Sequence, residues 1–227
     1  MIKAVIFDMF ETLVTHYESP VYMAKQISND IGISEEKFRE VWNPTDDDRT
    51  LGKRTLEDVI EEVLKVNHCY STELFEKIIT KRKMSKIECF EHIHPEIIPL
   101  FMTLKEQNIK IGLITNCYFE ERDVIKDSIF FDYFDSVCMS CEMGIKKPDV
   151  KIFQKCMRDL MVAPEECLYI GDGGAFELET AQMLGMYPLQ ATWYLKDGVN
   201  QPAKKKKEFL QAEAPLEVMK EIDRHKE

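Results

Sequence analysis

The sequence has no long hydrophobic run. None of its apolar stretches approaches the ~18 residues that a membrane-spanning helix requires. Its first residues already resemble a β-strand, and they lack the basic, apolar and small-residue regions of a secretory signal. We therefore expect a cytoplasmic protein without a membrane partner.

Positive charge is also in short supply. The chain carries 30 Lys and Arg residues against 41 Asp and Glu residues, a net charge of -11. Proteins that bind nucleic acid meet the phosphate backbone with a basic surface, so nucleic acid is excluded as the main partner. One basic run at residues 204–207 opposes this trend, and we interpret it as a solvated stretch before a final acidic helix.

The cysteines form no recognisable disulfide framework. They number seven and are scattered through apparent core segments, which is typical of proteins from a reducing cytoplasm. The CxxC motif from Cys138 to Cys141 has neither a second pair nor a supporting histidine. A redox or zinc-binding role for it is therefore the minor interpretation.

What the chain does contain is an alternation of strand and helix patterns. Its 227 residues suffice for one domain with an insertion or for two small domains. After residue 90, apolar residues at helical spacing alternate with short continuous apolar runs, which are typical of buried parallel strands. The expected strands are residues 2–7, 109–115, 137–139, 167–171 and 187–191. This pattern predicts an α/β fold, a doubly wound parallel sheet with helices on both faces.

Residues 16–88 break the alternation. Apolar residues there recur at helical spacing and predict helices at 19–31, at 34–42 and around 56–64 and 74–79, without a convincing strand. We interpret residues 16–88 as an inserted all-helical cap domain, with the α/β core formed by residues 1–15 and 89–227. The loop at residues 43–53 is expected to be its least regular part.

Polar residues stand where the predicted strands end. Ligands of doubly wound sheets bind beyond the carboxyl ends of the strands. Asp8 ends the first strand, Thr115 and Asn116 end the second, and Asp172 ends the strand at 167–171, while Lys147 lies in a loop before a helix. We therefore expect two carboxylates, a hydroxyl and an ammonium group to converge on one crevice.

The order of these residues resembles the motifs of the haloacid dehalogenase-like (HAD) hydrolase superfamily. The first motif, Asp-x-Asp-x-Thr, is matched by "DMFET", and the fourth, Gly-Asp with a second acid about five residues later, by "GDGGAFE". The second motif is a strand-end Thr or Ser and the third is a Lys before Pro. The matching positions are Asp8, Thr12, Thr115, Lys147, Asp172 and Glu177. The resemblance covers nearly the whole chain and implies a Rossmann-like core with a helical cap inserted after the first motif.

The resemblance also implies the roles of these residues. Asp8 would be the nucleophile that forms a covalent aspartyl intermediate. In phosphatases of this kind Mg²⁺, a hard cation that prefers oxygen ligands, is bound by a few protein groups. Here those would be Asp8, the backbone carbonyl of Phe10, Asp172 and Glu177, the last directly or through water. Catalytic roles fall to Asp8, Thr115 and Lys147, and substrate binding to Thr115, Asn116 and Lys147.

Two departures from the first motif affect the chemistry. Phe10 replaces the second aspartate, which in the phosphatases protonates the leaving oxygen, and Glu11 stands where glycine is common. A positioned acid or base is worth about 10²–10⁴ in rate. Its loss should be felt most for alkyl phosphates, whose leaving groups need a proton, and least for aryl or acyl phosphates.

Three functions stay open. The favoured one is a Mg²⁺-dependent phosphatase of a small phosphorylated metabolite, in which Glu11, His16 or a cap residue replaces the missing acid. A 2-haloacid dehalogenase would explain Phe10, because halide leaves without a proton. Such enzymes work without metal, however, and the acids Asp172 and Glu177 would then repel Asp8. A non-catalytic binding protein is the third, which the retained nucleophile, acid and lysine disfavour.

The cap is expected to set substrate choice by closing over the crevice. Arg39, Arg49 and Lys53 are cap cations that could meet an anionic substrate, although each is equally well explained as a surface charge. Arg49 and Lys53 are the better candidates because they lie in the irregular loop. The sequence leaves the oligomeric state open between monomer and dimer.

Overall fold

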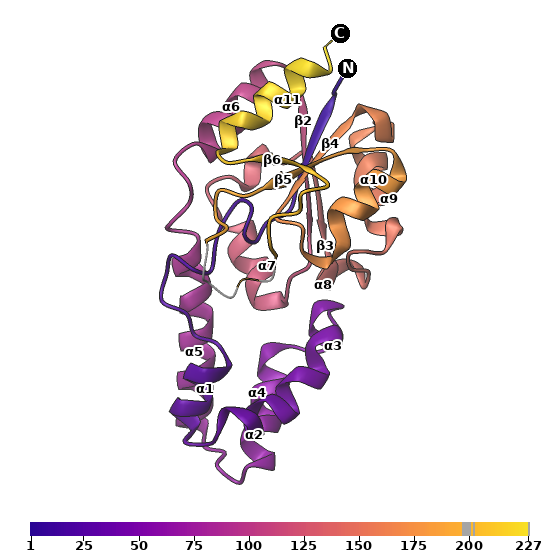
Figure 1. Ribbon diagram of the computed structural model, residues 1–227. Helices are drawn as coiled ribbons and strands as arrows, with labels where there is room; N and C mark the ends of the chain where they lie inside the picture. The colour runs from indigo at the N-terminus through magenta and orange to yellow at the C-terminus, as the bar shows by residue number, and fades with distance from the viewer. Residues whose placement is uncertain (197–200, 202, 227) are drawn as a thin grey trace.

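The protein is built on one parallel sheet. The computed structural model describes residues 1–196, 201 and 203–226. Six strands lie in the order β3-β2-β1-β4-β5-β6, and every adjacent pair is parallel (Figure 1). The strands are β1 (Ala4–Phe7), β2 (Lys110–Thr115), β3 (Ser136–Met139), β4 (Cys167–Gly171), β5 (Tyr187–Ala191) and β6 (Leu210–Ala212). The predicted doubly wound sheet is confirmed, and β1 lies at its centre.

The sixth strand was not predicted from the sequence. β6 has only three residues, of which Leu210 and Gln211 are exposed. It pairs with β5 at the edge of the sheet. A short, exposed edge strand carries no continuous apolar run, so periodicity gives no signal for it.

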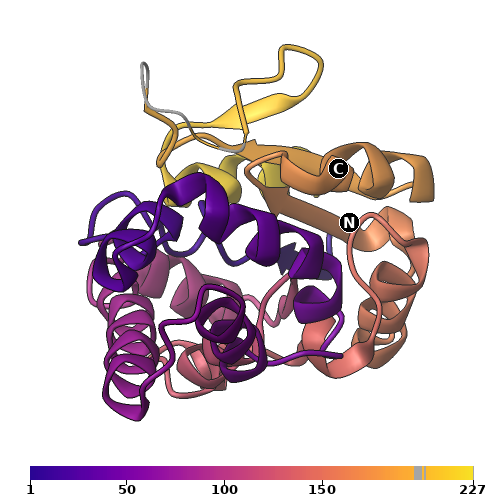
Figure 2. The same cartoon turned by 90° about the horizontal axis from the view of Figure 1, so that it is seen from below.

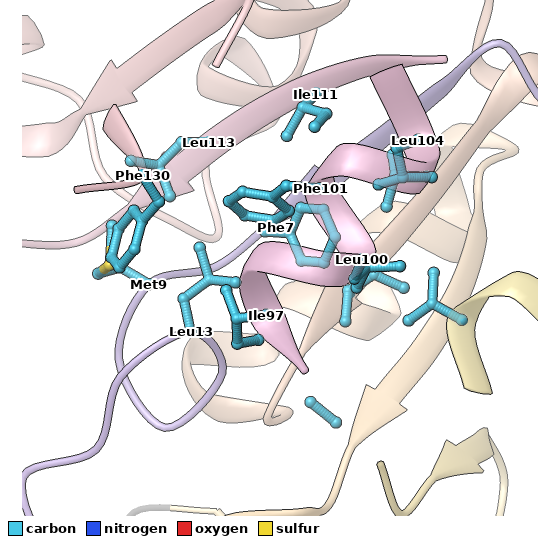
Figure 3. Close-up of a cluster of buried hydrophobic side chains, with 14 of the residues drawn as sticks. Phe7, Met9, Leu13, Ile97, Leu100, Phe101, Leu104, Ile111, Leu113 and Phe130 are labelled. Atoms are coloured by element: carbon cyan, nitrogen blue, oxygen red, sulfur yellow. The ribbon is translucent and has the colours of Figure 1, made fainter. Parts of the chain in front are cut away.

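Helices cover both faces of the sheet. α6 (Ile97–Glu106) and α11 (Val218–Arg224) lie on one face, and α9 (Val150–Leu160) and α10 (Glu177–Leu184) on the other (Figure 1). Figure 3 shows the core on the α6 side, where Phe7 of β1 packs against Phe101 with ring centroids 5.3 Å apart. Further connecting helices are α7 (Phe119–Lys126) and α8 (Ser140–Met143). The buried strands are held between two apolar layers.

Residues 24–89 form a separate helical body that we call the predicted cap. It consists of α1 (Ala24–Ile31), α2 (Glu35–Trp42), α3 (Asp46–Thr50), α4 (Leu56–Val66) and α5 (Thr72–Cys89). These helices have their own apolar core, and no residue from 16 to 88 is in a strand. They lie beyond the carboxyl ends of the strands and stand in front of the sheet when it is seen from below (Figures 1 and 2). The domain boundaries at residues 16 and 88 stay a prediction.

The segment 43–53 is more regular than expected. A 3₁₀ turn at Asn43–Thr45 leads directly into α3. Asp46, Asp47 and Asp48 occupy the first turn of α3, where carboxylates interact favourably with the helix dipole. The sequence prediction of an irregular loop was wrong because the turn-forming residues here begin a helix that tertiary packing then holds.

None of the helices in the described part of the chain combines the length and the hydrophobicity that crossing a bilayer would take.

Candidate active site

The polar strand ends meet in a pocket of about 530 Å³ between the sheet and the predicted cap. Asp8 follows β1, Asp172 follows β4, and Lys147 comes from the loop between α8 and α9. All three line the pocket together with Asn116 and Glu177. The predicted convergence of charged strand-end residues is therefore present in the structure.

Lys147 joins two of the carboxylates. Its buried ammonium lies 2.6 Å from Oδ1 of Asp8 and 2.5 Å from Oε2 of Glu177. Burial by itself lowers the pKa of Lys147, but the charges of Asp8 and Glu177 outweigh it and raise that pKa above its ordinary range. Lys147 is therefore a fixed positive charge beside the predicted nucleophile.

Asp8, Asp172 and Glu177 form a cluster of three buried carboxylates. One oxygen from each lies within 4.8 Å of the others, and no second group of this kind was found among the described residues. Burial and the charge of Glu177 raise the pKa of Asp8 to about 7, against the opposing effect of Lys147. Burial and the charges of Glu177 and Asp8 raise the pKa of Asp172 to about 8. When all three carboxylates are ionised, the cluster holds more negative charge than the single ammonium of Lys147 balances.

The chain after β4 is shaped to hold two of these acids. Gly173 has φ 95°, a left-handed conformation that suits glycine, and its N–H donates to Glu177 Oε1 at 3.1 Å. The N–H of Gly174 donates to Asp172 Oδ1 at 2.8 Å. A Cβ atom on Gly171 would lie 2.0 Å from Glu177 Oε1. The glycines therefore provide both the donors and the space that the carboxylates need.

Tyr169 is a site residue that the sequence analysis missed. It lies in β4, and its hydroxyl donates to Glu177 Oε2 at 2.9 Å. The same hydroxyl is 3.5 Å from the Lys147 ammonium. A tyrosine inside an otherwise apolar buried strand was the available signal, since a buried hydroxyl needs a polar partner.

The two residues that end β2 differ in their surroundings. Asn116 lines the pocket, and its amide is hydrogen-bonded to the backbone of Lys147. Thr115 is completely buried and is not among the lining residues of this pocket. Its hydroxyl lies 3.5 Å from the carbonyl of Asn116. The structure therefore brings Asn116 to the site and leaves Thr115 behind it, and the roles of both as substrate ligands stay predictions.

Phe10 lines the pocket beside the predicted nucleophile. Its ring stacks on His16 with centroids 4.7 Å apart and meets Phe90 edge-on at 6.5 Å. Phe10 offers no proton at this position. Whether its backbone carbonyl binds a metal stays a prediction.

Glu11 has a left-handed backbone with φ 58°, which explains why a glycine would suit this position. Its buried carboxylate accepts hydrogen bonds from Thr15 Oγ1 at 2.6 Å and from the backbone N–H of His16 at 3.0 Å. Gln201 Nε2 lies 3.4 Å from the same carboxylate. These contacts fix the turn that carries Phe10 and His16 into the pocket.

A second charged cluster lines the pocket, and the sequence analysis did not find it. Lys86 of α5 lies 2.6 Å from Glu121 Oε1 of α7 and 2.8 Å from His16 Nε2. Burial and the charge of Arg82 lower the pKa of Lys86, and burial together with Lys86 lowers the pKa of His16. Burial works to raise the pKa of Glu121, but Lys86, His16 and Arg82 lower it to about 2. We call His16, Lys86 and Glu121 the Lys86 cluster.

The three cap cations named from the sequence have different surroundings. Arg39 lines the pocket and pairs with Glu35 on its own helix. Arg49 is only 1% exposed, and its guanidinium lies between the rings of Trp42 and Tyr118, 3.8 Å and 4.4 Å from their centroids. Lys53 is exposed and pairs with Asp48. Arg49 therefore connects the predicted cap to the core.

The CxxC residues lie in different parts of the core. Cys138 of β3 belongs to the apolar cluster on the α9 side, and Cys141 of α8 to the cluster on the α6 side. Cys141 lies 3.7 Å from Cys117 between the two sulfur atoms, and all seven cysteines are free. The basic run at 204–207 is exposed as expected except for Lys206, which pairs with Glu179.

Comparisons with known proteins identify the family and the fold of this chain. The family model of the haloacid dehalogenase-like hydrolases matches residues 2–185. The glyceraldehyde 3-phosphate phosphatase of Methanopyrus kandleri is 30% identical over 200 residues, which cover 82% of this chain and 82% of that protein. The fold is shared with an HAD family enzyme of Bacteroides thetaiotaomicron in complex with magnesium and inorganic phosphate (TM-score 0.65, 19% identity, 88% of this chain and 97% of that one). It is shared equally with a 2-haloacid dehalogenase from Pseudomonas syringae (TM-score 0.67, 20% identity, 99% of both chains).

Proposed function

The chain belongs to the haloacid dehalogenase-like hydrolase family, and on that premise we propose that it is a Mg²⁺-dependent phosphatase of small phosphate monoesters. The relative that is 30% identical along most of both chains carries the name of a phosphatase, which supports this reaction class. A pocket of about 530 Å³ lies in the range of small-molecule sites. The natural substrate is therefore a small phosphorylated metabolite.

The three-carboxylate cluster is the observation that carries the proposal. Asp8, Asp172 and Glu177 present oxygen ligands within 4.8 Å of one another, and oxygen is the donor that Mg²⁺ prefers. Burial and repulsion from neighbouring carboxylates raise the pKa values of Asp8 and Asp172, and a divalent cation would favour their ionised forms. The residues present fit the metal. When bound, Mg²⁺ offsets the repulsion between these carboxylates and an anionic phosphate.

The residues of the chain divide the remaining work. The carboxylate of Asp8 attacks phosphorus, so that a P–O bond to Asp8 forms while the P–O bond to the leaving group breaks. The ammonium of Lys147, 2.6 Å from Asp8, balances the charge of the nucleophile and of the transferred phosphoryl group. Water then cleaves the aspartyl phosphate and releases inorganic phosphate. Asn116 keeps the Lys147 backbone in place during both steps.

Dehalogenation is the second candidate, because Phe10 favours it. A halide leaves without a proton, so an aromatic residue in this position does no harm to that reaction. The same site, however, contains Asp172 and Glu177 beside Asp8. Burial and the charge of Glu177 raise the pKa of Asp8, so less of the nucleophile is ionised when no metal is bound, which weighs against a metal-free reaction.

We also propose that the enzyme works in the cytoplasm, since seven free cysteines are typical of a reducing compartment.

One assay separates these functions. p-Nitrophenyl phosphate and 2-chloropropionate are each incubated with the protein in Mg²⁺ and in EDTA, and phosphate or chloride release is measured. We expect phosphate release that requires Mg²⁺ and is abolished by Asp8→Asn. Chloride release that persists in EDTA would overturn the proposal in favour of the dehalogenase.

A further inference from the structure

The pocket must supply a proton that Phe10 cannot provide. When an alkyl phosphate is cleaved, the leaving oxygen departs as an alkoxide unless an acid protonates it, and a positioned acid is worth about 10²–10⁴ in rate. Glu11 and His16 follow Phe10 in the sequence, are ionisable and line the pocket. Glu11 is not the proton donor that we infer, because its carboxylate already accepts hydrogen bonds from the Thr15 hydroxyl and from the backbone N–H of His16.

The contacts of His16 show where its proton lies. An ammonium group can only donate, so Nε2 of His16 accepts from Lys86 at 2.8 Å. The ring proton of neutral His16 is then on Nδ1, which lies 3.4 Å from Glu11 Oε1. His16 therefore presents no free donor to the pocket; it holds the ammonium of Lys86 instead.

Lys86 has the donor that the other two lack. His16 and Glu121 occupy two of the three N–H groups of its ammonium, at 2.8 Å and 2.6 Å, and the third has no hydrogen-bond partner among the described residues. Lys86 lines the same pocket as Asp8, and its nitrogen is 5.7 Å from the centroid of the Phe10 ring. The group is buried and held from two elements, since Glu121 belongs to α7 and His16 to the segment after β1.

We propose that Lys86 is the proton donor to the leaving oxygen, in the place of the acid that Phe10 replaces. This inference rests on the proposed phosphatase function. As the P–O bond to the leaving group breaks, the electron pair of that bond takes a proton from the Lys86 ammonium, and the product leaves as an alcohol. Lys86, now an amine, takes a proton from the water that attacks the aspartyl phosphate. The ammonium is thereby restored and the cycle closes without another reactant.

The test compares two substrates in two variants. Lys86→Arg keeps a positive charge that can still pair with Glu121, but a guanidinium is not deprotonated in proteins and cannot transfer a proton. Lys86→Met removes both the positive charge and the transferable proton. For each protein kcat/KM is measured with an alkyl phosphate, such as glycerol phosphate, and with p-nitrophenyl phosphate, whose leaving group is stable as an anion. Lys83→Met is the matched control, since Lys83 is exposed on the same helix and pairs with Glu57.

We expect Lys86→Arg to lower kcat/KM for the alkyl phosphate by about 10²-fold, the lower end of the contribution of a positioned acid. Its activity on p-nitrophenyl phosphate should stay within about 3-fold of the wild type. Lys83→Met should leave both activities unchanged. If Lys86→Arg keeps full activity on the alkyl phosphate, or if it loses both activities equally, Lys86 is not the acid.

A second substitution is tested in Lys86→Arg rather than in Lys86→Met, because Glu121 keeps a charged partner in the first variant and loses it in the second. In the Lys86→Arg background, Phe10→Asp introduces the usual acid and should restore alkyl phosphate turnover. In the wild-type background, Phe10→Asp should add little, because an acid is already present. If Phe10→Asp strongly raises alkyl phosphate turnover in the wild type and does not raise it in Lys86→Arg, Lys86 is not the acid. The proposed phosphatase function would stand in that case. Absence of any phosphatase activity in the wild-type protein would overturn the proposed function and this inference with it.

Discussion

The side-chain amide of Asn116 holds the backbone of Lys147 at two points. Asn116 Oδ1 accepts a hydrogen bond from the Lys147 N–H at 2.8 Å, and Asn116 Nδ2 donates to the Lys147 carbonyl at 3.1 Å. The two residues are 31 positions apart and belong to different parts of the core. This pair connects the end of β2 to the loop that carries the ammonium, so the sheet determines where Lys147 lies.

Removal of the Asn116 amide should therefore reduce activity through Lys147. We expect Asn116→Ala to lower kcat by at least about 10-fold. It should also lower the free energy of unfolding by about 1–3 kcal/mol, the cost of leaving buried backbone groups without partners. Asn116→Asp keeps the acceptor for the Lys147 N–H but loses the donor to its carbonyl, so an intermediate effect is expected. Steady-state kinetics and urea unfolding check this, and a wild-type kcat in Asn116→Ala would contradict it.

The metal-free protein should lose stability as the pH rises from about 5 to 8. Burial and neighbouring carboxylates raise the pKa of Asp8 to about 7 and that of Asp172 to about 8. Aspartate in an unfolded chain has a pKa of about 3.9, so between these values the native state binds more protons than the unfolded state. At low pH these bound protons stabilise the folded state relative to the unfolded chain. This stabilisation is lost as the pH rises and Asp8 and Asp172 lose their protons.

Calorimetry in EDTA measures this effect as a Tm that is several degrees lower near pH 8 than near pH 5.5. In Asp172→Asn, residue 172 no longer titrates and one carboxylate beside Asp8 is gone. The Tm of this variant should therefore depend less on pH. The same pH dependence in both proteins would show that these acids do not carry it.

Gly171→Ala should disturb the carboxylate cluster. The new methyl group would lie 2.0 Å from Glu177 Oε1, so the carboxylate has to move away from Lys147 and Tyr169. Misplacement of groups around a metal typically costs 10- to 100-fold in metal affinity, and a loss of about this size is expected for Mg²⁺ by isothermal titration calorimetry.

Glu177→Asp provides the matched test of that clash. A shorter acid withdraws from the added methyl, so Gly171→Ala combined with Glu177→Asp should recover part of the Tm that Gly171→Ala alone loses. Additive losses in the double variant would mean that the two positions do not interact.

Arg49 and Lys53 form a natural pair for a stability test. Arg49 is buried between Trp42 of the predicted cap and Tyr118 of the core. A desolvated cation over an aromatic ring contributes about 2 kcal/mol, so Arg49→Ala should destabilise the protein by at least about that amount. Lys53 belongs to an exposed ion pair, for which the expected effect of Lys53→Ala is below about 1 kcal/mol.

Urea unfolding of both variants gives the comparison. Because Arg49 connects two parts of the molecule, Arg49→Ala should also raise the radius of gyration measured by X-ray scattering, whereas Lys53→Ala should not. Equal stabilities of the two variants would show that the aromatic contacts of Arg49 add nothing.

Much of the fold could be predicted because its signals are local. Continuous apolar runs identified β1, β2 and β4, and apolar residues at helical spacing identified α4, α5, α6 and α9. The helix expected at 34–42 is α2, which Ser34 caps by accepting a hydrogen bond from the Lys37 N–H at 3.3 Å. β6 was missed because three residues, two of them exposed, carry no periodic pattern. α3 was missed because a buried Arg49 gives no apolar signal.

The sequence by itself determined the family and the polar residues at the ends of the strands. Both follow from the order of residues along the chain, which gives the motifs and the positions of the strands. Asp8, Asp172 and Lys147 were predicted to meet since parallel strands end at one edge of a sheet. Only the tertiary structure decided which side chains reach the pocket. Thr115 ends its strand as expected but stays buried behind the site. Lys86 and His16, 70 residues apart, come into contact because a helix of the predicted cap packs against the core beside Phe10. No local periodicity encodes such a contact, since it depends on how the helices of the predicted cap pack against the core.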